Sequence, residues 1–243
     1  DLLAQRDADP TLGFRQLTLN YGNMTNRGVE LTLNSVNLQT RHLRWTTGVN
    51  FGYNKNTLDD VEDSNPNVLS YTSGFAAVKG HPLGAIFSYR YAGLSGTHGT
   101  PRYYVDGGNR TDAQVSNLAD LAYSGTRHPT YSGSLSNTIA YKNFELSFMF
   151  MFYGGNVLRT EAAPYLSEPT HLNPNKEMNN IWRQPGDERN PDATPAFTGY
   201  ALDLTTMVHP WHAADKHVFK ADYAKLRHVS LTYRVPQQLV SRC

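Results

Sequence analysis

Two neighbouring stretches in the middle of the chain alternate between apolar and polar or smaller side chains. In residues 144–153, one set of alternate positions holds Phe144, Leu146, Phe148, Phe150 and Phe152. The other set holds Glu145, Ser147, Met149, Met151 and Tyr153. Residues 131–141 alternate more weakly, with leucine, isoleucine and tyrosine set against serine and threonine. Because successive side chains of a strand point to opposite faces, both stretches predict β-strands with one apolar face.

The two residues between these strands, Lys142 and Asn143, predict a tight hairpin turn. Each arm is about ten residues long, which is the length that a tilted strand needs to cross a bilayer. A hairpin in a soluble β-sandwich would also alternate, so pattern and length leave both interpretations open. The almost wholly aromatic apolar face favours a membrane strand, and we interpret Phe144, Leu146, Phe148, Phe150 and Phe152 as facing lipid.

Weaker alternation elsewhere predicts about seven strands in all. They lie near residues 15–37, 43–54, 84–94, 100–106, 131–141, 144–154 and 219–235. The short turns should all lie on one side of the membrane and the long loops on the other. Strand directions then alternate correctly only if residues 100–106 form a further strand. Long polar loops are expected over 55–82, 107–130 and 155–218. Short turns on one side and long loops on the other are typical of transmembrane β-barrels.

Composition narrows the class of protein. The chain has 243 residues, of which 39% are hydrophobic, and no apolar run is long enough for a transmembrane helix. The formal net charge of +1 argues against a nucleic-acid partner. The one cysteine, Cys243, allows no internal disulfide framework. The chain opens without a targeting segment and stops soon after a turn, so we expect it to be a fragment of a longer protein.

The residues that carry enzyme or metal chemistry do not form a recognisable constellation. His209 and His212 have a spacing that can bind metal, but no third ligand is evident. The acidic run at residues 59–63 lacks the ordered spacing of a calcium loop. Neither a GxSxG nucleophile motif nor a glycine-rich phosphate loop occurs. The sequence therefore predicts no enzyme, no metal site and no cofactor.

Aromatic residues in the loops are the candidate contact residues. Such side chains can stack on sugar rings, pack against a partner protein, or fold the loop onto itself, and the sequence leaves these alternatives open. The candidates are Tyr103, Tyr104, Tyr165, Trp182, Tyr200 and Trp211.

Five segments, taken in order, resemble the SusC/RagA-type TonB-dependent outer-membrane transporters. They are residues 20–34, 45–56, 78–94, 129–157 and 221–236, and they cover a little over a third of the chain. The resemblance implies a barrel of about twenty-two strands with an N-terminal plug. This chain would be a late, C-terminal part of that barrel, without the plug and the final strands. The expected fold class is therefore all-β, an antiparallel transmembrane β-barrel portion with long extracellular loops.

The same resemblance implies a function and a set of partners. It implies import of an oligosaccharide or peptide across the outer membrane of a Gram-negative bacterium, with this chain supplying barrel wall and vestibule. The implied partners are a SusD-like lipoprotein lid, TonB acting through the plug, and outer-membrane lipid. Residues 155–218 are where we expect the contact with the lid or the substrate. The alternative is a secreted or surface carbohydrate-binding β-sandwich, and a β-rich hydrolase is the third hypothesis.

Overall fold

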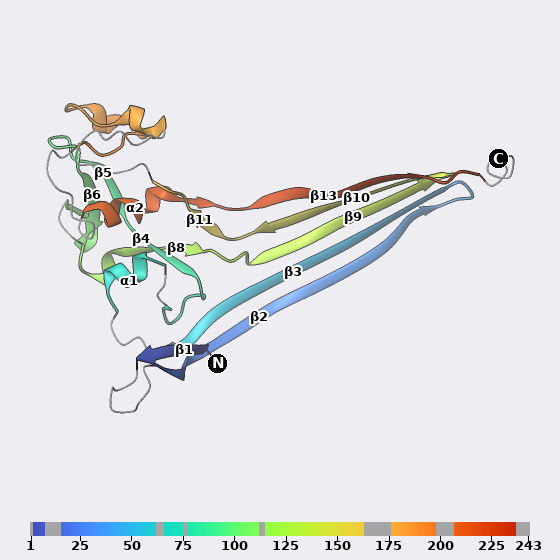
Figure 1. Ribbon diagram of the computed structural model, residues 1–243, viewed down its shortest axis with the longest axis horizontal. Helices are drawn as coiled ribbons and strands as arrows, with labels where there is room; N and C mark the ends of the chain where they lie inside the picture. The colour runs from blue at the N-terminus through green and yellow to red at the C-terminus, as the bar shows by residue number, and fades with distance from the viewer. Residues whose placement is uncertain are drawn as a thin grey trace. The chain divides into compact units, whose positions relative to one another are not determined.

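The computed structural model describes residues 2–7, 16–61, 66–74, 77–111, 115–162, 176–197 and 207–236 (Figure 1). Two compact units divide the chain. Unit 1 contains residues 1–24, 57–127 and 157–219, and unit 2 contains residues 25–56, 128–156 and 220–243. Within the described part of the chain, no helix is long and apolar enough to span a membrane.

The largest sheet has the strand order β1-β2-β3-β9-β10-β13 (Figure 1). Its strands are β1 (Leu2–Asp7), β2 (Gln16–Gln39), β3 (Leu43–Val61), β9 (Tyr131–Tyr141), β10 (Phe144–Gly154) and β13 (Tyr223–Tyr233). Strands β3, β9, β10 and β13 are paired antiparallel in this order. The sheet is open, because β1 and β13 each have one neighbour. The predicted antiparallel β-barrel class is therefore confirmed as a wall segment, without closure in this chain.

The hairpin between β9 and β10 forms at the two residues that the pattern indicated. β9 and β10 have the predicted bounds, and Lys142 adopts a positive φ of 51° in the turn. The turn is held by its neighbours. The amide of Lys142 donates to the carbonyl of His42 at 2.8 Å, and the amide of Arg234 donates to the carbonyl of Asn143 at 2.8 Å. The β2–β3 turn lies beside it, with the amide of Thr40 donating to Leu43 O at 2.8 Å.

The structure corrects the predicted strands between β3 and β9. Residues 84–94 form two short strands, β4 (Ala85–Tyr89) and β5 (Tyr91–Leu94), and residues 101–105 form β6 (Pro101–Val105). None of the three joins the six-stranded sheet. All five residues of β4 are buried, which explains why its apolar pattern does not mark a lipid-facing strand. β3 pairs directly with β9 in antiparallel direction. The strand directions of the sheet therefore alternate without a further strand at residues 100–106.

Three further bounds differ from expectation. Residues 55–61, expected in a loop, continue β3. The expected loop 107–130 contains β7 (Asn109–Thr111) and β8 (Leu121–Thr126). The last predicted strand is divided into β12 (Val218–Lys220) and β13. Polar side chains hide residues 55–61 and β7 from a prediction based on hydrophobic alternation, because the strand structure of these segments comes from backbone pairing.

Unit 1 is built from small sheets and short helices. Its sheets are β4-β8, β5-β6-β7 and β11-β12, with β11 at Val157–Arg159. Its helices include α1 (Val68–Thr72) and α2 (His209–His212), with 3-10 turns at Asp106–Gly108, Leu118–Asp120, Lys176–Asn180, Asp187–Arg189 and Asp215–His217. A core of buried Val68, Tyr89, Tyr103, Val115, Ala213 and Ala214 joins these elements. Segments distant in sequence thus share one core.

Candidate functional site

The four paired strands of unit 2 present one continuous apolar face. Residues directly opposite each other in an antiparallel pair point to the same face of the sheet. The register places the alternate apolar residues of β10 opposite Tyr141, Ile139 and Leu135 of β9. On the other side they lie opposite Tyr233, Leu231, Val229 and Leu226 of β13. Strand β3 adds Leu43, Trp45, Val49 and Phe51 to this face through its pairing with β9.

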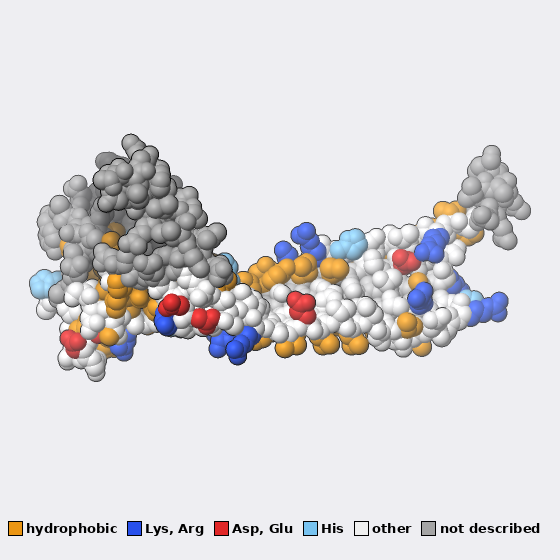
Figure 2. Space-filling view, turned by 90° about the horizontal axis from the view of Figure 1, so that it is seen from below, with side chains coloured by type: hydrophobic (Ala, Val, Ile, Leu, Met, Phe, Trp, Pro, Cys, Tyr) orange, Lys and Arg blue, Asp and Glu red, His pale blue; other side chains and the backbone are white. Residues whose placement is uncertain are grey.

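Aromatic rings contact one another across this face. Phe144 and Tyr233 have ring centroids 4.7 Å apart, and those of Phe148 and Phe150 are 6.0 Å apart. Phe144 is 52% exposed and Phe150 is 41% exposed, while Leu146, Phe148 and Phe152 are partly buried. Figure 2 shows hydrophobic side chains in a row along the lower side of the strands of unit 2. In the described residues, the five predicted lipid-facing side chains therefore lie on one largely uncovered apolar surface.

One buried polar group interrupts the apolar face. Asn137 of β9 lies opposite Thr47 of β3 and opposite Phe148 of β10, and it is 8% exposed. Its Oδ1 accepts hydrogen bonds from Trp45 Nε1 at 2.9 Å and from Thr47 Oγ1 at 2.7 Å. Thr47 Oγ1 in turn accepts from Asn37 Nδ2. We name Asn37, Trp45, Thr47 and Asn137 the polar chain; its hydrogen bonds offset the cost of placing amide and hydroxyl groups on an apolar surface.

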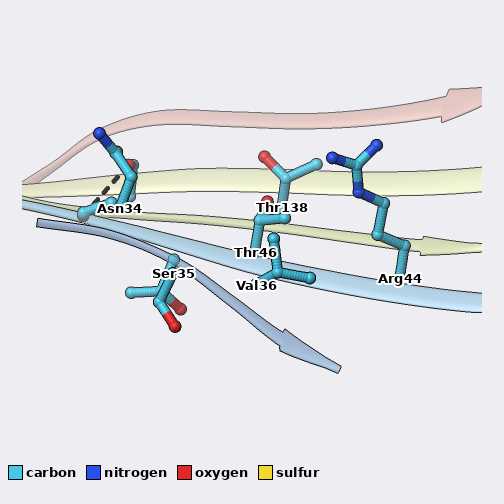
Figure 3. A pocket seen from close by; sticks show the side chains of 9 residues that line it. Asn34, Ser35, Val36, Arg44, Thr46 and Thr138 are labelled. Carbon is cyan, nitrogen blue, oxygen red and sulfur yellow. Dashed lines mark hydrogen bonds between the residues drawn. The ribbon is translucent and has the colours of Figure 1, made fainter. Parts of the chain in front are cut away.

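The opposite face of the same strands carries small and polar side chains. Thr32 Oγ1 donates to Asn50 Oδ1 at 3.1 Å, and Asn50 Nδ2 donates to Ser134 Oγ at 3.2 Å. A shallow hollow of about 320 Å³ lies on this part of unit 2 (Figure 3). Its lining residues are Asn34, Ser35, Val36, Arg44, Thr46, Thr47, Gly48, Ser136 and Thr138. In Figure 3, Asn34, Thr138 and Arg44 project from the same side of the strands.

Gly48 is part of the reason that this hollow exists. A Cβ atom at this position would lie 2.7 Å from Ser136 Oγ and 3.1 Å from Asn34 Oδ1. Ser136 Oγ donates to the carbonyl of Gly48 at 3.2 Å, a contact that the missing side chain permits. One sheet therefore separates an apolar surface from a polar, hydrogen-bonding surface, as a wall between lipid and water requires.

Two of the predicted aromatic contact residues are buried in unit 1. Tyr103 is 4% exposed and Trp211 is fully buried. The ring of Tyr103 lies 5.4 Å from that of Tyr89, and the ring of Trp211 lies 5.8 Å from that of Tyr91. Their burial favours the alternative in which loop aromatics fold unit 1 onto itself. Tyr165 and Tyr200 lie outside the described residues.

The other two, Tyr104 and Trp182, are only partly buried. Trp182 Nε1 donates to Glu188 Oε2 at 3.1 Å, and its ring lies over Gly99, which has a φ of +66°. A Cβ at Gly99 would come within 2.5 Å of the indole ring. Tyr104 lies between two arginines, with Arg90 and Arg110 contacting its ring. Contact with a ligand remains a prediction for both.

A polar hollow of about 410 Å³ is lined by residues that lie close to Trp182 in the sequence. Amide, guanidinium and carboxylate groups surround it, and they can donate to and accept from hydroxyl or peptide groups. Asp187 shapes this segment, because its Oδ2 accepts from the amides of Arg183 at 2.9 Å and Gln184 at 3.1 Å. The lining residues are Asn179, Asn180, Ile181, Arg183, Gln184, Asp187 and Asn190.

No pattern in the sequence indicates that a partly buried arginine links three elements of unit 1. Arg159 of β11 donates to the carbonyls of Thr72 at 2.7 Å and Phe87 at 2.6 Å, and to Ser88 Oγ at 3.1 Å. Burial lowers the pKa of Arg159, and the neighbouring Arg127 lowers it further. An arginine at the end of a short strand looks like an ordinary surface residue, so only the fold identifies this role.

Three histidines lie in the same unit as this arginine, and burial lowers the pKa of each. The pKa of His217 falls to about 4, through burial first and then the charges of Lys216, His212 and Arg159. Burial also lowers the pKa of His209, whose Nε2 lies 2.8 Å from Thr72 Oγ1. Burial lowers the pKa of His212 as well, and the charge of Glu161 partly opposes this shift. Within the described residues, no three His, Cys, Asp or Glu side chains are grouped to hold a metal ion.

Comparison with known proteins agrees with this geometry. No protein-family model matches the chain. TonB-dependent receptor P3 of Formosa agariphila is 23% identical over 100% of this chain, and TonB-dependent receptor P39 of the same organism is 22% identical over 96%. The chain spans about a quarter of the length of these relatives, 25% and 26% respectively.

Solved structures show the same fold. The RagAB peptide importer in its closed-closed state matches with a TM-score of 0.75 and 19% identity, over 98% of this chain and 26% of that one. The RagAB peptide transporter matches with a TM-score of 0.75 and 20% identity, over 99% of this chain and 26% of that one. Together the comparisons confirm the predicted resemblance to TonB-dependent transporters of the SusC/RagA type.

Proposed function

We propose that this chain forms part of the barrel wall of a TonB-dependent importer in the outer membrane of a Gram-negative bacterium. The observation that carries the proposal is the four-strand register of unit 2. It places an apolar surface, interrupted by the polar chain, on one face and mainly hydroxyl and amide groups on the other. Strands of this kind, about ten residues long, are those that cross outer membranes.

The imported nutrient is an oligosaccharide or a peptide. The relatives are named TonB-dependent receptors, and the structural neighbours are titled a peptide importer and transporter. In this proposal TonB acts through a plug domain outside residues 1–243. A SusD-like lipoprotein covers the extracellular loops, and residues 155–218 contact that lid or the substrate. The amide-rich hollow near Trp182 supports a vestibule role, because its groups can exchange hydrogen bonds with a passing solute.

The chain has no bond-making role in this proposal, since import leaves the substrate intact.

The carbohydrate-binding sandwich is less well supported. A sandwich buries the apolar face of its sheet against a second sheet, whereas Val229, Leu231 and Leu33 of unit 2 are 57%, 70% and 55% exposed.

Two neighbouring arginine substitutions test the assignment of the faces. Phe148→Arg places a charge on the apolar face, and Ser147→Arg places the same charge on the polar face one residue away. In the full-length protein refolded into lipid vesicles, Phe148→Arg should lower the free energy of unfolding by about 2–4 kcal/mol. Ser147→Arg should lower it by much less. Equal losses for the two variants would contradict the proposal.

A further inference from the structure

The three-stranded sheet β5-β6-β7 of unit 1 has one buried face and one cationic face. Tyr103 of β6 is in the core, with Tyr91 and Val105 packed beside it. Because side chains alternate along a strand, Arg102 and Tyr104 of β6 point to the opposite face. The register places Arg110 of β7 directly opposite Tyr104. The amide of Tyr104 donates to the carbonyl of Arg90 at 2.9 Å, so Arg90 lies on its other side.

Two guanidinium groups flank the one aromatic ring. The Cζ atom of Arg90 is 5.7 Å from the centroid of the Tyr104 ring, and that of Arg110 is 5.4 Å from it. Arg110 also donates from Nη2 to Tyr104 Oη at 3.3 Å. Arg90 and Arg110 are exposed, and Tyr104 and Arg102 are partly buried. The ring thus holds two exposed cations in place through cation–π contacts.

No described carboxylate forms an ion pair with these arginines. The ion pairs described elsewhere in the chain join Lys79 to Asp60 and Arg234 to Glu145. Asp215 interacts electrostatically with Arg90, but its Oδ1 accepts a hydrogen bond from the amide of Tyr91. The fold therefore gathers the positive charges of Arg90, Arg102 and Arg110 on a face that the core does not use.

We propose that this face, Arg90, Arg102, Tyr104 and Arg110, binds the acidic side chains of a peptide substrate. Guanidinium forks match carboxylates in bidentate geometry. The flanking arginines occupy the sides of the Tyr104 ring, which leaves it poorly placed to stack on a sugar. The inference rests on the proposed import function and narrows its substrate class to peptides that carry aspartate or glutamate.

A binding measurement on the full-length protein tests this assignment. The probe is a fluorescently labelled oligoglutamate peptide, followed by fluorescence polarisation in detergent. We compare the wild type with Arg90→Gln/Arg110→Gln. The matched control is Lys79→Gln/Arg127→Gln, which removes the same charge from exposed positions of unit 1 outside this face and outside residues 155–218. Equal amounts of each variant in the outer membrane verify folding.

The expected result is that the wild type binds oligoglutamate and that binding weakens with added salt. The Arg90→Gln/Arg110→Gln variant should bind about tenfold more weakly or worse, since charge-assisted hydrogen bonds are lost. The control should stay within about twofold of the wild type.

Absent binding would overturn the inference, and so would equal loss in the control variant or equal affinity for oligoglutamine. Arginine-dependent binding of an oligogalacturonate that is tighter than that of oligoglutamate would assign the face to acidic glycans and overturn the peptide assignment. The Phe148 and Ser147 variants report separately on the wall, so either proposal can fail while the other stands.

Discussion

The polar chain on the apolar face makes a sharp prediction about Asn137. Asn137 Oδ1 accepts two hydrogen bonds, from Trp45 Nε1 and Thr47 Oγ1. Replacing Asn137 with Leu removes this acceptor and leaves the indole N–H of Trp45 facing apolar surroundings. The ring of Trp45 is 41% exposed and faces lipid in the proposed wall. An unmade hydrogen bond of a group held away from water costs about 1–3 kcal/mol. Thr47 loses less, because its hydroxyl retains its contact with Asn37. We therefore expect Asn137→Leu to destabilise the protein by about 2 kcal/mol.

A double-mutant cycle separates this effect from packing. Trp45→Phe removes the donor, and Trp45→Phe/Asn137→Leu removes both partners of one hydrogen bond. Since replacing both partners by apolar groups can be nearly neutral, the double variant should be more stable than the sum of the single losses predicts. The expected coupling energy is about 1–2 kcal/mol, within the range measured for contacting residues.

The assay is urea unfolding of the full-length protein in lipid vesicles, followed by the gel mobility shift between folded and unfolded protein. This readout does not depend on Trp45 fluorescence, which one variant lacks. A coupling energy near zero would refute the reasoning. So would an Asn137→Leu variant that is more stable than the wild type, because the amide would then not be needed by its neighbours.

Three further predictions concern unit 1. Arg159→Met should destabilise this unit by several kcal/mol, since it removes the donor shared by three acceptors; limited proteolysis within residues 57–127 would report it, and unchanged protease resistance would contradict it. His217 has a folded pKa of about 4, below its ordinary 6.5, so its contribution to stability is complete above pH 6.5 and is lost as the pH falls toward 4. His217→Phe should reduce this acid sensitivity in melting curves between pH 7 and pH 4, and an unchanged slope would speak against it. Gly99→Ala should displace Trp182, because the added Cβ would meet its ring; a hydrogen-exchange measurement that finds the Trp182 segment unaltered would exclude this contact.

Hydrophobic alternation predicted the strands whose side chains face two different environments. β9 and β10 could be read to the residue because an apolar face and a polar face alternate along them. The same reasoning failed at residues 84–94, since β4 is buried on both faces and its aromatic residues serve the core of unit 1. The apolar pattern of these residues resembles that of a membrane strand, but it reflects burial inside unit 1.

The candidate site was predicted only in part, for a related reason. Aromatic content drew attention to Tyr103 and Trp211, but sequence does not distinguish a buried ring from an exposed one, and both are buried. The cationic face depends on Tyr104 of β6 and Arg110 of β7 meeting Arg90, which lies between β4 and β5. These residues meet because of which strands pair with one another, and no local pattern in this chain predicts that pairing.

The central claim is that the two faces of the β10 strand meet lipid and water. Nitroxide spin labels on single cysteines at Phe150 and Met151, in a Cys243→Ser background, test it directly in the full-length protein in vesicles. Oxygen concentrates in lipid, and a nickel chelate remains in water. The account predicts that the label at 150 collides mainly with oxygen and the label at 151 mainly with the chelate. Equal accessibility of the two labels to both reagents would contradict it.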